Sequence, residues 1–279
     1  MLNHSTTKIT EQPSKHRHLE KMTVGEITRR INEEDKTVPN AIEKVLPSLN
    51  KLIEALVEKL KNGGRLFYLG AGSGGRLSVL DAIEMPTTYG VPKGLFNVIL
   101  AGGVDKLVEA LEEKEDDIHE GPRQLTLNKV GVKDLVIGIS ASGTTPFVLE
   151  SLKYCKENGI ITGCIVSNPD SAIARYADFP VEVITGPEFV AGSTRMKCGT
   201  AQKMIFDIIS TTTMIQLGRV EDNSMVHVSL INDKIKDRAV RMLMQKTGIT
   251  DYEEASALLS KHGSVKTAKD VFLNNDVSQ

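Results

Sequence analysis

The chain has 279 residues with 34 basic and 36 acidic side chains, and it contains no tryptophan. The balanced charge argues against a nucleic-acid surface, and an aromatic content of 4% argues against a platform on which bases stack. The three cysteines have no paired spacing, which predicts a cytoplasmic protein with reduced thiols. The N-terminus has no apolar core and no run approaches membrane-spanning length, so neither a signal peptide nor contact with a membrane is expected. The histidines are scattered, so no metal site is expected.

The part of the chain before the first strand predicts an arm followed by helices. Residues 1–20 are polar and predict an extended arm, and a short helix is expected over Val24–Glu34. Apolar residues recur at helical spacing through Pro39–Lys61, which predicts an amphipathic helix with one buried face.

The next stretch predicts a buried strand, a glycine-rich loop and a helix. Leu66–Leu69 is a short apolar run, Gly70–Gly75 contains four glycines, and Arg76–Met85 has a helical pattern that Pro86 ends. A glycine loop between a strand and a helix directs free backbone N–H groups at a ligand, which favours an anion site.

Two acidic features of the following region have more than one interpretation. Glu84 shares a helical face with Leu77 and Leu80. It is either a carboxylate that reaches water near the helix end, which is the commoner situation, or an acid held in a partly dry site. The acidic run over residues 112–117 is, on charge pattern alone, a solvated helix face.

Strand-like runs alternate with helices through the middle of the chain. The four further apolar runs are Phe96–Ala101, Asp134–Ser140, Ile161–Ser167 and Val181–Ile184. Helices are expected from the second strand through Lys114 and over Pro146–Asn158. This alternation predicts an α/β fold with a five-stranded parallel sheet covered by helices on both faces, and ligands bind such sheets above the carboxyl ends of the strands.

The last third of the chain predicts only helices. A long helix is expected over Thr194–Leu217, and glycine breaks separate three shorter ones, Asn232–Lys246, Asp251–Lys261 and Val265–Asn274. The predicted organisation is therefore an N-terminal arm with a short helix (1–39), a phosphosugar-binding domain (40–220) and a small C-terminal helical module (221–279).

Two loops are candidates for anion binding. The glycine loop formally matches G-x-G-x-x-G, but no acid stands at the end of the second strand to hold a ribose, so a nicotinamide cofactor is not expected. The loop after the third strand carries the hydroxyls of Ser140, Ser142, Thr144 and Thr145 around Gly143, directly before a helix. This pattern favours a phosphate monoester bound without metal, whereas the simpler alternative is that Thr145 only caps the helix.

A third polar loop, Gly186–Lys197, precedes the long helix. Its Glu188, Ser193 and Lys197 either contribute to a sugar or carboxylate site or only cap that helix, and the sequence leaves both interpretations open.

Three segments together resemble the N-acetylmuramic acid 6-phosphate etherases: GAGSGGRLSVLDAIEMPTTYGV, ISASGTTPF and GPEFVAGSTRMKCGTAQKMIFDIISTTTMIQLGRV. The resemblance begins near Thr10-Glu11-Gln12, runs through Arg238 and extends to the small C-terminal module. It implies a flavodoxin-like sugar isomerase domain, related to the glucokinase regulatory proteins. It also implies a homodimer with the active site near the subunit interface, a 6-phosphosugar substrate and no cofactor.

The resemblance further implies removal of the D-lactyl ether from N-acetylmuramic acid 6-phosphate, in peptidoglycan recycling. Its motifs imply that Glu84 is the acid that protonates the departing lactate and that Glu115 is the base. Both roles replace the simpler interpretations given above for Glu84 and for the acidic run. The leucines on the same helical face are then expected to keep Glu84 partly dry. The implied substrate-binding residues are Gly72, Ser73, Gly74, Ser140, Ser142, Gly143, Thr144, Thr145, Glu188, Ser193 and Lys197.

The chain departs from the family pattern at Gly74, Ile83, Met85 and Thr144, where related sequences usually carry serine, serine, cysteine and arginine. These departures concern the preferred substrate more than the type of reaction. Two alternatives stay open: a non-catalytic sugar-phosphate sensor of the glucokinase regulatory type, and a phosphosugar aldose–ketose isomerase.

Overall fold

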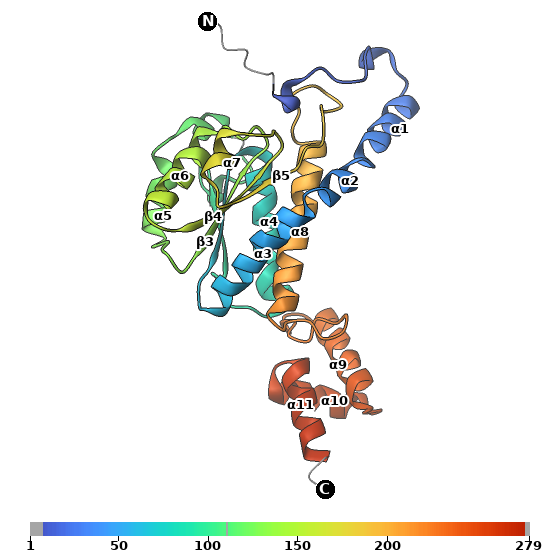
Figure 1. Cartoon of the computed structure of the whole chain (residues 1–279). Helices are drawn as coiled ribbons and strands as arrows, with labels where there is room; N and C mark the ends of the chain where they lie inside the picture. Colours follow the sequence, from blue (N-terminus) through green and yellow to red (C-terminus); the bar gives the residue numbers. More distant parts are fainter. Residues whose placement is uncertain (1–7, 110, 277–279) are drawn as a thin grey trace, which may run out of the picture. The chain divides into compact units, whose positions relative to one another are not determined.

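The computed structural model describes residues 8–109 and 111–276 (Figure 1). The chain divides into two compact units, one formed by residues 1–82 and 94–209 and the other by residues 83–93 and 210–279. The second unit therefore begins within helix α8 (Lys197–Gln216) and takes in the end of helix α4 (Gly72–Tyr89). The three-part division at 40 and 221 stays a prediction.

The first unit is built on a five-stranded parallel sheet, as predicted. Its strands, in the spatial order β2-β1-β3-β4-β5, are β1 (Leu66–Gly70), β2 (Phe96–Leu100), β3 (Leu135–Ser140), β4 (Ile161–Val166) and β5 (Phe179–Glu182). The chain leaves β1 toward β2 on one side and returns to β3 on the other. The strand order thus reverses between β1 and β3, and in open parallel sheets the crevice at such a reversal is where ligands bind.

Helices cover both faces of this sheet, also as predicted (Figure 1). One face carries α5 (Glu120–Leu127), α6 (Pro146–Glu157) and α7 (Ala172–Tyr176). The other carries α3 (Leu46–Lys61) and the parts of α4 and α8 that belong to this unit. The apolar stripe of α3 packs so closely that a Cβ on Gly163 of β4 would lie 2.5 Å from a Leu52 methyl. Buried apolar faces of this kind, rather than intrinsic propensity, hold the helices in place.

The segment before α3 is more structured than an extended arm. It contains two single 3₁₀ turns, η1 (Ile9–Glu11) and η2 (Leu19–Lys21), and then helices α1 (Val24–Asp35) and α2 (Val38–Glu43). Thr10 is buried, with 1% of its surface exposed, and its main-chain N–H and its hydroxyl both bond to the side chain of Asn168 in the loop after β4. The prediction of an extended arm over residues 1–20 is therefore wrong for residues 8–20, and residues 1–7 lie outside the part of the chain that the structure describes.

The predicted helix from the second strand through Lys114 is also wrong. The structure has two 3₁₀ turns there, η3 (Val104–Lys106) and η4 (Glu112–Asp116), after Gly102 and Gly103 with positive φ. Three apolar residues of this segment, Val104, Leu107 and Val108, are left exposed, and Val108 is 94% exposed. Without a buried face, a short helix gains too little stability to form.

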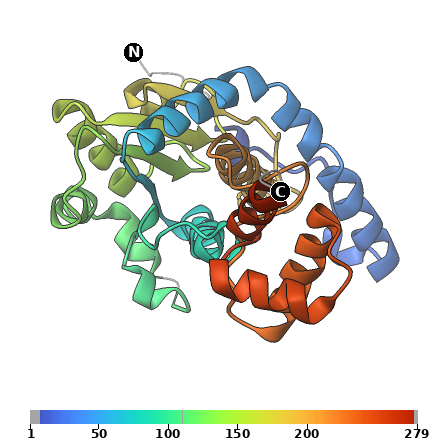
Figure 2. The same ribbon diagram turned by 90° about the horizontal axis from the view of Figure 1, so that it is seen from below.

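The second unit contains the three predicted C-terminal helices, drawn in orange and red in Figure 2. These are α9 (Asp233–Thr247), α10 (Tyr252–His262) and α11 (Val265–Asp276), which surround an apolar cluster of their own. Asn232 and Asp251 cap the starts of α9 and α10, and Gly248 and Gly263 end those helices in the left-handed conformation. Within the described ranges, no helix is long and apolar enough to cross a membrane.

Candidate active site

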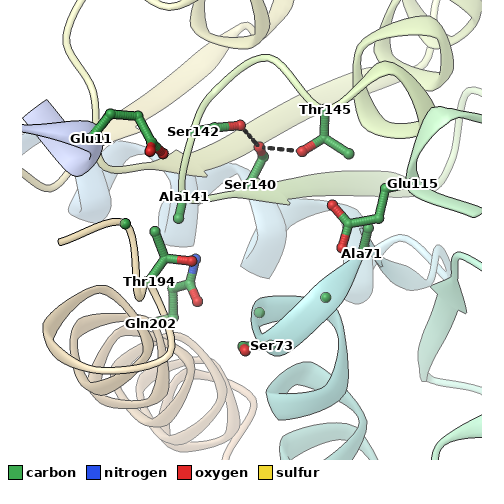
Figure 3. Close-up of a pocket in the computed structure, with 13 residues that line it drawn as sticks. Glu11, Ala71, Ser73, Glu115, Ser140, Ala141, Ser142, Thr145, Thr194 and Gln202 are labelled. Carbon is green, nitrogen blue, oxygen red and sulfur yellow. Dashed lines mark hydrogen bonds between the residues drawn. The ribbon is translucent and has the colours of Figure 1, made fainter. Parts of the chain in front are cut away.

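A pocket opens at the carboxyl ends of β1 and β3, where the strand order reverses (Figure 3). The segments after β1, β2 and β3, the loop before α8, helix α8 itself and the turn η1 contribute to it. Its lining residues are Glu11, Ala71, Gly72, Ser73, Gly74, Glu115, Ser140, Ala141, Ser142, Thr145, Gly192, Thr194 and Gln202. Two of the loops predicted to bind an anion thus meet in one place.

The glycine loop forms the first turn of α4, which begins at Gly72 and not at Arg76 as expected. The first N–H groups of a helix have no intrahelical partners, so this turn presents free donors at the pocket. Gly72 has a φ of +56°, and a Cβ there would lie 2.7 Å from a carboxylate oxygen of Glu115. At Gly74 a Cβ would lie 2.7 Å from Ile139 Cγ2 and 2.8 Å from Gln202 Oε1. The absence of a side chain at both positions therefore lets these neighbours approach closely in this chain.

The hydroxyl loop after β3 turns its side chains toward one another. Ser140 Oγ lies 3.2 Å from Ser142 Oγ and 2.8 Å from Thr145 Oγ1, as the dashed lines in Figure 3 show. Thr145 makes no side-chain cap for α6, so the capping interpretation does not hold. Gly143 lets the loop bend, with a φ of +70° and no room for a Cβ against Ser171. Gathered hydroxyls beside a helix start are suited to the oxygens of a phosphate.

Two carboxylates face the pocket from opposite sides, Glu115 from η4 and Glu11 from η1 (Figure 3). Glu115 is half-buried. Burial and the neighbouring charge of Glu112 raise the pKa of the Glu115 carboxyl, and Arg76 only partly opposes them. A carboxylate with a raised pKa is a stronger base than an ordinary surface carboxylate, which suits proton abstraction.

Glu11 was not expected in the site from the sequence. It is brought there because Asn168, which follows β4, holds the adjacent Thr10. The Asn168 Nδ2 donates to Thr10 Oγ1 at 3.1 Å and also to the main-chain oxygens of Ala141 (3.0 Å) and Ser142 (3.3 Å). One side chain thus ties the N-terminal turn to the hydroxyl loop. We call this set of contacts the Asn168 latch.

Gln202 is a second residue that the sequence did not single out. It is buried in the first part of α8, where its amide lies against Gly74 and lines the pocket. It stands in the GTAQK stretch that carries the resemblance, but nothing in its spacing separates it from an ordinary helical residue.

Glu84 lies elsewhere. It is exposed on α4 in the single chain and is not among the residues that line the pocket, so its catalytic role stays a prediction. The same exposed face of α4 carries Ile83 and Leu80, which are 64% and 42% exposed. Large apolar side chains gathered on a helix face are typical of a surface that another molecule covers.

Glu188, Ser193 and Lys197 do not line the pocket either, although Gly192 and Thr194 do. The buried Glu188 carboxylate accepts the main-chain N–H groups of Lys197 and Cys198, both at 2.9 Å, and so caps the start of α8. The buried Lys197 ammonium donates to Glu34 Oε2 at 2.6 Å. The Lys197 ammonium is thus paired with Glu34, and the Glu188 carboxylate is satisfied by main-chain N–H groups.

Of the remaining candidates, Gly72, Ser73, Gly74, Ser140, Ser142 and Thr145 line the pocket. Gly143 shapes the loop, and Thr144 lines a neighbouring hollow that shares Ser142 with the pocket. A search of residues 8–109 and 111–276 for three or more His, Cys, Asp or Glu side chains able to hold a metal ion finds none.

Comparison with known proteins agrees with this geometry. Residues 48–156 match the glucokinase regulatory protein N-terminal SIS domain, and residues 116–211 match the SIS domain. Among solved structures, the fold is similar to a phosphoheptose isomerase from Francisella tularensis (TM-score 0.53, 15% identity, 71% of this chain and 100% of that chain). It is also similar to the Vibrio vulnificus NanR protein complexed with ManNAc-6P (TM-score 0.52, 12% identity, 70% of this chain and 65% of that chain).

Sequence relatives are much closer than these structures. An N-acetylmuramic acid 6-phosphate etherase of Bacteroides thetaiotaomicron is 49% identical over 98% of both chains. One from Bacteroides fragilis is 50% identical over 96% of this chain and 95% of the relative, and one from Geobacillus thermodenitrificans is 43% identical over 96% and 90%. Identity of this extent over nearly the full length shows that the chain belongs to the N-acetylmuramic acid 6-phosphate etherase family.

Proposed function

We propose that this protein cleaves the D-lactyl ether of N-acetylmuramic acid 6-phosphate to give N-acetylglucosamine 6-phosphate and D-lactate. The observation that carries the proposal is the meeting, in one pocket, of a hydroxyl loop suited to phosphate and the Glu115 carboxylate with its raised pKa. The reaction would belong to amino-sugar metabolism and the recycling of peptidoglycan. The three buried free cysteines suit a reducing cytoplasm.

The phosphate would bind to the hydroxyls of Ser140, Ser142 and Thr145 and to the N–H groups at the start of α4. With its phosphate fixed, the opened sugar extends into the pocket with an aldehyde at C1, which makes the C2 proton acidic. Holding the chain in one place removes much of the entropic cost of the reaction.

Glu115 then acts as the base. It takes the proton from C2, the electron pair forms the C2–C3 double bond, and the C3–O bond to the lactyl group breaks. The departing lactyl oxygen takes a proton from an acid. Water adds to C3 and a proton returns to C2, which gives N-acetylglucosamine 6-phosphate with all atoms balanced. Each positioned proton transfer contributes roughly 10²–10⁴-fold to the rate.

Glu84 remains our candidate for the acid, now acting from a second copy of the chain in a homodimer. Its exposure on α4, beside the exposed apolar Leu80 and Ile83, supports a position in a subunit interface. In a two-fold dimer the same surface meets on both subunits, so each copy would supply its Glu84 to the site of the other.

The first experiment is incubation with N-acetylmuramic acid 6-phosphate and an assay for free D-lactate. Glu115→Gln is expected to slow lactate release by roughly 10²–10⁴-fold. Glu113→Gln, an exposed glutamate on the same turn, is the matched control and should retain activity. Formation of a ketose 6-phosphate without lactate would show an isomerase instead, and ligand binding without any turnover would show a sensor.

Mixing two inactive variants tests whether Glu84 acts on the active site of the other subunit. Glu84→Gln and Glu115→Gln should each bind product and release almost no lactate. After subunit exchange, mixed dimers would contain one intact site, so activity should recover to about a quarter of the wild-type level, the statistical share for a two-fold dimer. Full activity of Glu84→Gln alone would refute the role of that residue, and no recovery on mixing would refute its action across subunits.

A further inference from the structure

Within the part of the chain that the structure describes, the residues that line the pocket carry no positive charge that would balance an anionic ligand. Among the described residues that line it, the titratable side chains are Glu11 and Glu115, and none of the lining residues is basic. A phosphate carries close to two negative charges at neutral pH. Hydroxyls and N–H groups donate hydrogen bonds but do not neutralise that charge. A positive side chain close to the hydroxyl loop would supply the charge that these lining residues do not.

Lys8 occupies this position. Its Nζ donates a hydrogen bond of 2.7 Å to Thr144 Oγ1. The Thr144 hydroxyl in turn donates to Ser142 Oγ at 3.3 Å, and Ser142 lines the pocket. The ammonium is thus two hydrogen bonds away from a hydroxyl of the pocket. Lys8 and Thr144 also line the neighbouring hollow that shares Ser142.

Hydrogen bonds hold the main chain beside Lys8 against the hydroxyl loop. Thr10, two residues further on, is almost fully buried and is held by Asn168, which also donates to the carbonyl groups of Ala141 and Ser142. The turn that carries Lys8 is therefore bonded to the same loop that carries the phosphate hydroxyls. This limits the positions that the lysine side chain can reach to the vicinity of the loop.

We infer that Lys8 is a substrate-binding residue that supplies the positive charge for the phosphate group held by the hydroxyl loop. The inference rests on the proposed function only in taking a sugar 6-phosphate as the ligand. Binding of phosphate replaces or shares the bond between Lys8 and Thr144, since the ammonium has three donors. Lys8 takes no part in the proton transfers; it determines the preference for a phosphorylated over a neutral sugar.

The test is calorimetric titration with N-acetylglucosamine 6-phosphate and with inorganic phosphate, at two salt concentrations. Lys8→Met should weaken the binding of both ligands by roughly fivefold, the upper end of what one exposed charged contact contributes. The affinity of the variant should also depend less on salt, because one screened interaction has been removed. Lys8→Arg should keep most of the affinity. Lys21→Met, which changes an exposed lysine on the same N-terminal segment, should bind like the unchanged protein.

A double variant tests whether Lys8 contributes through its positive charge and not through the shape of its side chain. Thr144→Arg places a cation within the loop itself, so in that background Lys8→Met should cost much less affinity than it does alone. Unchanged phosphate affinity in Lys8→Met, or an equal loss in Lys21→Met, would overturn the inference, as would failure of Lys8→Arg to keep the affinity. These readouts need no turnover. Absence of lactate release would therefore count against the proposed reaction and not against Lys8.

Discussion

The Asn168 latch allows a sharp test of how the N-terminal turn reaches the site. Asn168→Asp keeps the shape of the side chain but replaces the donating Nδ2 by a carboxylate oxygen. That oxygen would face Thr10 Oγ1 and the carbonyl oxygens of Ala141 and Ser142, which now accept hydrogen bonds. We expect the turn that carries Lys8 and Glu11 to detach from the hydroxyl loop while the sheet stays folded.

The size of the effect follows from the bonds that are lost. The amide nitrogen has two hydrogens shared among three acceptors at 3.0 to 3.3 Å, so about two full hydrogen bonds disappear. At about 1 kcal/mol for each net bond, the docked state loses about 2 kcal/mol. That is roughly a thirtyfold shift toward the detached state, and repulsion between oxygens adds to it.

Hydrogen exchange measures this equilibrium directly. The amide protons of Thr10, Glu11 and Gln12, which bond to Asn168, Lys8 and Ile9, should exchange roughly thirtyfold faster in the variant. Amides of the central strands should exchange at their original rates. Phosphate affinity will also fall, but the added negative charge alone would lower it, so affinity is not the deciding measurement.

Asn62→Asp is the matched control, since its Nδ2 makes one exposed bond of 3.0 Å to the Glu58 carbonyl. It should leave exchange at residues 10–12 unchanged. The latch would be refuted by unaltered exchange at these residues in Asn168→Asp. Faster exchange spread evenly over the whole first unit would also refute it, because this would indicate general unfolding instead of local detachment.

Three further predictions concern the pocket and a buried ion pair outside it. Gly74→Ala puts a methyl 2.7 Å from an isoleucine methyl of β3 and should lower the free energy of unfolding by about 1–3 kcal/mol, measured with urea. Lys197→Met leaves the largely buried Glu34 without its closest cation and should cost about 3 kcal/mol; adding Glu34→Gln should restore part of that loss in a double-mutant cycle. Arg76→Met removes a charge that lowers the pKa of Glu115, so this pKa rises further and the fall of kcat/KM at low pH should begin at higher pH than in the unchanged enzyme.

The sheet and its pocket were predictable because their signals are local. Each strand is a short apolar run, and Gly70–Gly75 sits where a strand passes into a helix. Parallel strands end at the same edge, so the glycine and hydroxyl loops had to meet once the alternation of strands and helices was recognised. The positions of Ser73, Ser140 and Thr145 in the pocket follow from these local patterns.

The contributions of the N-terminal turn were not predictable in the same way. Thr10 and Asn168 are 158 positions apart, and no periodicity links them. A polar segment without an apolar pattern predicts an arm, whereas here a single asparagine binds it to a distant loop. The surroundings of Glu84 were open for a related reason: its helical face also carries two leucines, and the sequence alone left open whether that face is covered, whereas in the structure Glu84 is exposed.

The way in which the anion is held bears on the strength of the base. A guanidinium beside the phosphate within the pocket would bind it tightly, but it would also favour the ionised form of Glu115 and lower its pKa, which weakens it as a base. The pocket instead presents neutral donors, the hydroxyls and helix N–H groups. Burial can then raise the pKa of Glu115 without a strong opposing charge, and Arg76 opposes it only in part.

A positive charge outside the pocket, on Lys8, would neutralise the phosphate through the hydroxyl loop at a greater distance from the base. With the cation separated from the carboxylate in this way, one small pocket would hold a doubly charged ligand and keep a basic carboxylate beside it.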